Sequence, residues 1–250
     1  AAAYDYSGRL ISNAGDVNGD GFNDLIVGSY SDRAGTSYVV FGKSSGFDAV
    51  INTANLDGNN GFSIEGEAEG DEAGYSVDNA GDVNGDGFDD VLIGARSSGA
   101  SGEYSGAAYV VFGKDTGFDA TVNLTDLDGT NGFRLERGIA GELFGRAVSA
   151  AGDFNGDGND DLIIGAYAAD PNGQDSGAGY VVFGKSSGFS ASINIEELSN
   201  DEGFALNGIA VGDSLGKSVG SVGDINDDGF ADVIIGAPFG DGAIPNTGVG

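Results

Sequence analysis

Apolar residues recur along the chain in short runs, and glycine, asparagine or aspartate separates each run from the next. Many of the apolar residues are β-branched or aromatic, a composition typical of strands. No segment keeps an apolar period of about 3.6 residues, so we expect very little helix. The pattern therefore predicts an all-β chain made of short strands and tight turns.

Four kinds of run follow one another in a fixed order. Examples of the first to the fourth are GYSVDNAG at 74–81, DDLIIGA at 160–166, YVVFG at 109–113 and GFSIEG at 61–66. A linking stretch, such as INTANLDGNN at 51–60, lies between the third and fourth runs. Each unit is therefore predicted to hold four short strands.

Two phrases repeat at a constant step. YVVFGK occurs at 38–43, 109–114 and 180–185, at steps of 71 residues. A phrase of the type GDxNxDGxxD begins at Gly15, Gly81, Gly152 and Gly223, at steps of 66, 71 and 71 residues. Four-stranded units with this period predict β-propeller blades, because β-helix and leucine-rich repeats are shorter. We expect a partial ring of about three and a half antiparallel blades, with units at 8–66, 74–137, 144–208 and, incomplete, 215–250.

The second phrase offers oxygen donors at the spacing of a calcium loop. Positions one, three, five and nine are Asp, Asn, Asp and Asp, and position seven offers its backbone carbonyl. Glycine at position six, such as Gly87, permits the positive φ that a sharp turn requires. The expected ligands are Asp16, Asn18, Asp20, Phe22 and Asp24; Asp82, Asn84, Asp86, Phe88 and Asp90; Asp153, Asn155, Asp157, Asn159 and Asp161; and Asp224, Asn226, Asp228, Phe230 and Asp232.

Three carboxylates in one loop repel one another unless a cation lies between them. We therefore expect one Ca²⁺ per loop, four in the chain, although the sequence does not separate Ca²⁺ from Mg²⁺ outright. The alternative is that each loop is only a turn built from Asx and glycine. Four copies at fixed repeat positions favour calcium. Position eight varies among the copies and is expected to point away from the metal.

The loop differs from an EF-hand. An EF-hand ends in a bidentate glutamate at position twelve and is flanked by helices. Here position twelve is apolar in every copy, and the run that follows it has strand character. The residues at this position are Val27, Ile93, Ile164 and Ile235. A bound ion would therefore clip a strand–loop–strand hairpin.

Composition narrows the chemistry further. The 250 residues include 48 Gly, 40 Asp and Glu, and 10 Lys and Arg, giving a formal net charge of −30. This acidity argues against nucleic acid and anionic membranes as partners. There is no Cys or His, so disulfides, thiolate sites and the commonest general base are excluded, and metal ligands must be oxygen. No apolar stretch is long enough to insert in a membrane.

The loops and the residues around them resemble the FG-GAP repeat, the blade of the integrin α-subunit propeller. The "FG" element resembles Phe144-Gly145, and the "GAP" element resembles Gly236-Ala237-Pro238. The YVVFGK phrase is more similar to repeats of large bacterial surface proteins. The resemblance implies a propeller of about seven blades with calcium on its hairpins, and an extracellular or cell-surface role in adhesion. Further blades of the same chain or neighbouring copies are expected to complete the ring.

Three functions are weighed. We expect a calcium-stabilised extracellular module that binds a protein or glycan ligand through longer loops such as 96–106 and 167–179. A structural subunit of a calcium-dependent surface layer or fibre is the alternative, favoured by the near-identical units. A carboxylate-based glycan-active enzyme is a weaker possibility, because Glu65, Glu103 and Glu136 show no distinctive setting. No phosphate loop or nucleophile elbow is present, so the chain is not expected to be an enzyme.

Overall fold

The computed structural model describes residues 6–30, 34–99 and 101–240, and strands account for most of their regular structure. Three single-turn 3-10 segments, η1 (Thr53–Asn55), η2 (Leu124–Asp126) and η3 (Ile195–Glu197), are the only helical elements among these residues. The strands are β1 (Leu10–Gly15), β2 (Asp24–Ser29), β3 (Thr36–Val40), β4 (Gly61–Glu65), β5 (Ala73–Gly81), β6 (Asp90–Ala95), β7 (Ala107–Val111), β8 (Thr121–Asn123), β9 (Gly132–Glu136), β10 (Ala147–Gly152), β11 (Asp161–Ala166), β12 (Ala178–Val182), β13 (Ser192–Asn194), β14 (Gly203–Asn207), β15 (Ser218–Gly223) and β16 (Asp232–Gly236).

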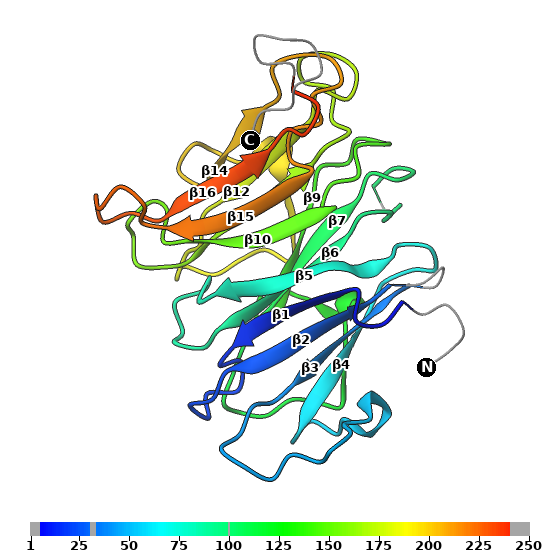
Figure 1. The fold of residues 1–250 in the computed structure, drawn as a ribbon, viewed down its shortest axis with the longest axis vertical. Coiled ribbons are helices and arrows are strands. Elements are labelled where there is room, and N and C mark those ends of the chain that lie inside the picture. Colours follow the sequence, from blue (N-terminus) through cyan, green and yellow to red (C-terminus); the bar gives the residue numbers. More distant parts are fainter. Residues whose placement is uncertain (1–5, 31–33, 100, 241–250) are drawn as a thin grey trace.

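Each repeat unit folds as one antiparallel sheet (Figure 1). The strand orders are β1–β2–β3–β4, β5–β6–β7–β9 and β10–β11–β12–β14, and the fourth unit contributes the hairpin β15–β16. The first strands of successive units, β1, β5, β10 and β15, lie side by side along the middle of the molecule. The predicted four-stranded antiparallel sheets are confirmed for three units, and the described residues form no closed ring.

One irregularity recurs at the same place in every unit. The register between the first and second strands shifts at a glycine that ends the first strand, as at Gly15 and Gly81. These two glycines have φ of +74° and +73°, a region that side chains disfavour, and such a bulge bends the strand. The bend directs the chain into the acidic loop that follows.

The second unit is buried on both faces of its sheet, because it lies between its two neighbours. Alternate residues of β6 belong to different cores: Ile93 packs with Val39 and Phe62 of the first unit, whereas Leu92 packs with Ile164 of the third. This is why the second strand reads as a continuous apolar run rather than an alternating one. The apolar core of the molecule therefore lies between units.

Two short strands in the linking stretches were not predicted from the sequence. β8 belongs to the second unit but pairs in parallel with β4 of the first, and β13 pairs in the same way with β9. Beside each short strand a phenylalanine stacks on the preceding unit: the Phe118 and Phe62 ring centroids are 4.2 Å apart, and those of Phe189 and Phe133 are 4.3 Å apart. Each unit thus overlaps its predecessor.

No helix within the described residues has the length and apolar character that a bilayer crossing would require.

Candidate functional site

The four acidic loops occupy equivalent places at one end of the sheets. They span residues 16–23, 82–89, 153–160 and 224–231, each between the first and second strand of a unit. In Figure 1 the loop of the first unit and that of the fourth both project on the side toward which the β1 and β15 arrows point. The repeat therefore sets the candidate ligands along a single edge of the molecule.

Backbone N–H groups wrap each loop around the oxygen donors at positions one and three. In the first loop, Asp20 N donates to Asp16 Oδ1 and to Asn18 Oδ1, both at 2.9 Å. Gly21 N donates to Asp16 Oδ2 at 2.9 Å. The same three hydrogen bonds recur in the second, third and fourth loops. Oxygens from positions one and three thus meet at the same N–H group.

The aspartate at position nine is buried in the first three units. Asp90 is fully buried, and its two oxygens accept hydrogen bonds from Val83 N at 3.0 Å and Gly113 N at 2.9 Å. Asp24 and Asp161 are held in the same way. In the fourth unit, Asp232 accepts from Ile225 N at 2.9 Å.

Burial raises the pKa of these aspartates well above the ordinary range. The pKa of Asp90 rises to about 8 and that of Asp24 to about 6, and the carboxylates at positions one and five of the same loop add to the rise. Because like charges repel at short range, the position-nine group lies close enough to the others to feel them. A divalent cation beside these oxygens would reverse that unfavourable interaction.

The donor set fits a hard cation such as Ca²⁺, because every available ligand is a carboxylate, amide or carbonyl oxygen on a tightly curved loop. Within the described residues, however, no group of three or more acidic side chains is drawn together closely enough to hold a metal. Their oxygens accept hydrogen bonds from backbone N–H groups instead. Ion binding would therefore require the side chains at positions one, five and nine to turn inward.

The variable position eight makes contacts that were not foreseen. Asp89 of the second loop accepts a hydrogen bond from Asp16 N of the first loop at 2.7 Å, and Asp160 accepts from Asp82 N at 2.9 Å. The side chain points away from its own loop, as expected, but it holds the loop of the preceding unit. Ala231 has no carboxylate to do this in the fourth loop. Sequence variation at this position concealed its role.

The YVVFGK phrase also contacts the loops. The backbone N of Lys114 donates to Val17 O of the preceding loop at 2.9 Å, and Lys185 N donates to Val83 O at 2.9 Å. The lysine side chains lie over phenylalanine rings, with Lys114 Nζ 4.9 Å from the Phe118 centroid. Because both phrases share a step of 71 residues, their fixed spacing was the signal that could have suggested this contact.

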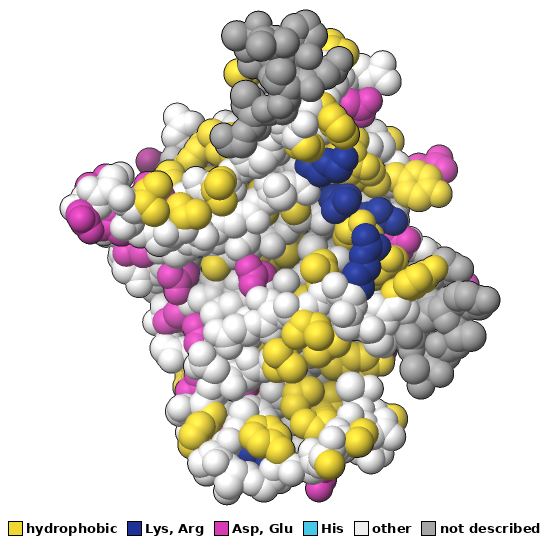
Figure 2. Space-filling model, in the orientation of Figure 1, with side chains coloured by type: hydrophobic (Ala, Val, Ile, Leu, Met, Phe, Trp, Pro, Cys, Tyr) yellow, Lys and Arg dark blue, Asp and Glu magenta, His cyan; other side chains and the backbone are white. Residues whose placement is uncertain are grey.

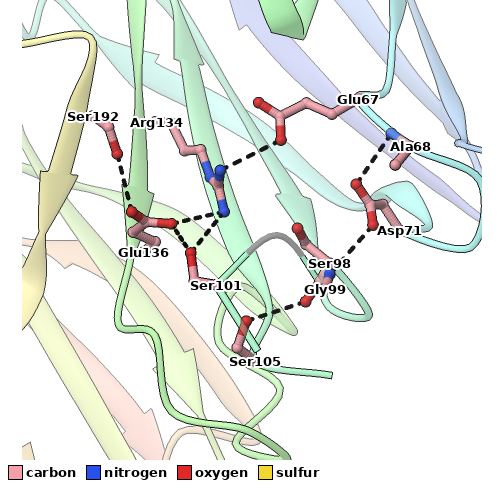
Figure 3. Close-up of polar contacts among 10 residues, drawn as sticks. All are labelled: Glu67, Ala68, Asp71, Ser98, Gly99, Ser101, Ser105, Arg134, Glu136 and Ser192. Carbon is pink, nitrogen blue, oxygen red and sulfur yellow. Dashed lines mark hydrogen bonds and ion pairs between the residues drawn. The ribbon is translucent and has the colours of Figure 1, made fainter. Parts of the chain in front are cut away.

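The carboxylates outside the loops do not form an evident catalytic pair. Glu136 is half-buried and lies 2.7 Å from Arg134 Nη2, with hydrogen bonds from Ser101 and Ser192 (Figure 3). Its counterpart Glu65 accepts a hydrogen bond from Thr36 at 3.1 Å. The expectation that both occupy a solvated face is wrong, because neighbouring side chains from other strands partly cover them.

Comparison with known proteins agrees with the repeat pattern. A profile of the FG-GAP repeat matches residues 7–40, 73–111, 144–182 and 218–250, together more than half of the chain. Each match contains one acidic loop, and the first three also contain the second and third strands of a unit.

Several curated proteins are similar over part of the chain. Integrin alpha-4 of Xenopus laevis is 30% identical over 162 residues, which cover 63% of this chain and 14% of the relative. Integrin alpha-PS5 of Drosophila melanogaster is 33% identical over 185 residues, covering 70% and 16%. A phosphatidylinositol-glycan-specific phospholipase D of Dictyostelium discoideum is 33% identical over 170 residues, covering 63% and 17%. The chain thus spans less than a fifth of the length of these relatives.

Proposed function

The chain belongs to the FG-GAP repeat family, and from this premise we propose that it is an extracellular interaction module whose blades are stabilised by calcium. Repeats of this family often bind calcium and form the blades of β-propellers. The observation that carries the proposal is the loop geometry, which recurs with the same hydrogen bonds in four units. We propose that each loop holds one Ca²⁺ through positions one, three, five, seven and nine.

Calcium would act here on stability. The unfolded chain has no preformed site, so the free energy of binding adds to the free energy of folding. Each site adds roughly 2.7 kcal/mol when free calcium is a hundred times its dissociation constant. The loops also contact one another through position eight, so ion binding in one loop would support its neighbour.

Partner binding is proposed for the opposite end of the sheets. Strand β6 begins at the second acidic loop and ends at Ala95, so the long β6–β7 connection emerges at the other end. The β11–β12 connection emerges there as well. Loops at this end vary in length between units, whereas the acidic loops do not. Variable loops on a rigid scaffold are the usual location of binding residues.

The test is thermal unfolding in calcium, in magnesium and in chelator, together with a count of bound ions by native mass spectrometry. We expect one calcium ion per loop and a marked fall in the unfolding midpoint on chelation. The variant D82N/D86N should bind one ion fewer. The matched control D115N/D119N removes the same charge at exposed positions outside the loops and should leave the count unchanged. A protein that binds no calcium and keeps its midpoint in chelator would overturn the proposal.

A second candidate is a subunit of an ordered assembly, favoured by exposed counterparts of buried residues. Phe47 of the first unit is 52% exposed, although its equivalents Phe118 and Phe189 stack on a preceding unit. Strand β14 has no parallel partner among the described residues, unlike β4 and β9. Another blade or a neighbouring copy could cover both surfaces. Sedimentation in calcium at rising protein concentration tests this candidate, and a purely monomeric chain would argue against it.

A further inference from the structure

One position at the start of the first strand collects the unpaired positive charge of the molecule. The residue after a conserved-in-repeat glycine is Arg9 in the first unit, Tyr75 in the second, Arg146 in the third and Lys217 in the fourth. Because the first strands lie side by side, the repeat brings these four side chains into one row. The row lies at the end of the strands opposite the acidic loops.

The row borders a hollow of about 280 Å³ between the first strands of the units. We call it the cationic hollow and define it by the residues used below: Arg9, Arg146, Lys217, Val77, Val148 and Val219. Figure 2 shows Lys and Arg side chains gathered in one strip, whereas Asp and Glu side chains lie mainly along the opposite side of that view. The molecule thus separates its few positive charges from its many negative ones.

The cations of the hollow are not neutralised by the acidic residues that dominate the chain. Within the described residues, the cations that form ion pairs with carboxylates are Arg96, Arg134, Arg137 and Lys185. Arg9, Arg146 and Lys217 form none with a described carboxylate, although the sequence holds 40 acidic residues against 10 basic ones. A cation without a carboxylate partner in such a chain is available to an external anion.

Aromatic rings hold these cations in place without cancelling their charge. The guanidinium carbon of Arg146 lies 5.0 Å from the Tyr75 ring centroid and 5.5 Å from that of Tyr167. Lys217 Nζ lies 4.6 Å from the Phe239 centroid and 5.6 Å from that of Tyr167. Such contacts orient a cation over the ring and leave its other side open. The row is therefore partly preorganised for a ligand.

The hollow also offers apolar contact beside the charge. Val77, Val148 and Val219 occupy equivalent positions two residues after the row and line the hollow. Sites that combine an apolar surface with a few charged groups recognise ligands carrying both features. A uniform polyanion would have nothing to place against the valines. Beyond the hollow, a long polyanion would also meet the field of a chain whose net charge is −30.

We propose that the cationic hollow binds a short acidic segment of a partner protein, in which an aspartate or glutamate lies next to an apolar residue. The carboxylate contacts Arg146 and Lys217, with Arg9 at the edge of the row, and the apolar side chain packs against Val77 and Val148. The inference rests on the proposed interaction function and gives it a place and a ligand class. It does not depend on the number of calcium ions.

The test is fluorescence anisotropy with a labelled nine-residue peptide that alternates aspartate with leucine, measured on the calcium-loaded chain. The comparison peptide replaces each aspartate with asparagine. We expect the aspartate peptide to bind at least about tenfold more tightly than the asparagine peptide. Raising the salt concentration should weaken binding, because part of the hollow is open to solvent.

Two double variants locate the site. R146Q/K217Q removes two cations of the hollow and should weaken the aspartate peptide about tenfold or more. The control K43Q/K114Q removes two lysines that also lie over phenylalanine rings but outside the hollow, and should leave the affinity within about twofold. Thermal unfolding of each variant in calcium checks that it is folded. Arg9→Gln provides an independent variant if the first double variant fails to fold.

The outcomes separate this inference from the proposed function. A folded, calcium-loaded chain that does not bind the aspartate peptide overturns the inference alone. Equal weakening in both double variants overturns it too, because binding would then reflect overall charge. Binding of an oligogalacturonate of equal charge, without binding of the peptide, would replace the partner class with an acidic glycan. Failure to bind calcium while the peptide still binds would overturn only the calcium proposal.

Discussion

The aspartate at position nine joins three segments of chain at one buried point. Asp90 begins β6, and its carboxylate accepts from Val83 in the preceding loop and from Gly113 at the end of β7. Gly113 must be glycine, since a Cβ there would collide with the carbonyl oxygen of Asp89. One side chain thus fixes the loop against two strands, whether or not an ion is bound.

Replacing Asp90 with alanine tests this structural role separately from calcium. Asp90→Ala leaves two buried N–H groups without an acceptor, so the free energy of unfolding in chelator should fall by about 3 kcal/mol. Urea unfolding measures it. Asp90→Asn keeps one acceptor and should lie between the two. The exposed control Asp115→Ala should change stability by no more than about 0.5 kcal/mol, and an equal loss in both alanine variants would contradict the assignment.

Position eight carries a contact between loops that its varied sequence conceals. Asp89 holds Asp16 N, whereas its equivalent Asn23 in the first loop is exposed. Asp89→Ala should therefore lower the free energy of unfolding by about 1 kcal/mol, and Asn23→Ala should not change it measurably. Chemical denaturation of the two variants side by side makes the comparison. Equal effects would mean that the hydrogen bond adds nothing to stability.

At the scale of strands, the sequence predicts what is local and misses what is shared between units. The four strands of a unit are evident because each has an apolar or alternating run bounded by turn residues. β8 and β13 have only three residues each, and their pairing partners lie in the preceding unit. The likeness of Phe47, Phe118 and Phe189 marks the linking stretch as part of the repeat, yet it does not reveal which unit the ring contacts.

The overlap between units can be tested with a matched pair of phenylalanines. Phe118 stacks on Phe62 and is packed against the core, whereas Phe47 is exposed at the equivalent position. Phe118→Ala should lower the free energy of unfolding by about 3 kcal/mol, while Phe47→Ala should cost no more than about 0.5 kcal/mol. Thermal or urea unfolding distinguishes them. A small effect at both positions would show that the linking stretch does not stabilise the preceding blade.

For the whole molecule, charge is the dominant feature. A net charge of −30 on 250 residues produces self-repulsion, most of it near the loops that lack a cation when calcium is removed. Sodium chloride screens this repulsion. In chelator, raising salt from low to moderate concentration should therefore stabilise the chain by roughly 1 kcal/mol. With calcium bound the gain should be smaller, and calorimetry at several salt concentrations measures both; identical salt responses would contradict this account.

The offset between sheets and repeat units bears on how such a chain can change in length. Each unit supplies the fifth strand of the sheet before it, so every copy both receives and donates the same three-residue pairing. Gain or loss of a 71-residue segment by unequal recombination, wherever its endpoints fall within the repeat, joins equivalent positions and restores every such pairing. The gene can therefore lengthen or shorten in whole blades without creating a mismatched junction, which makes blade number an easily varied inherited trait.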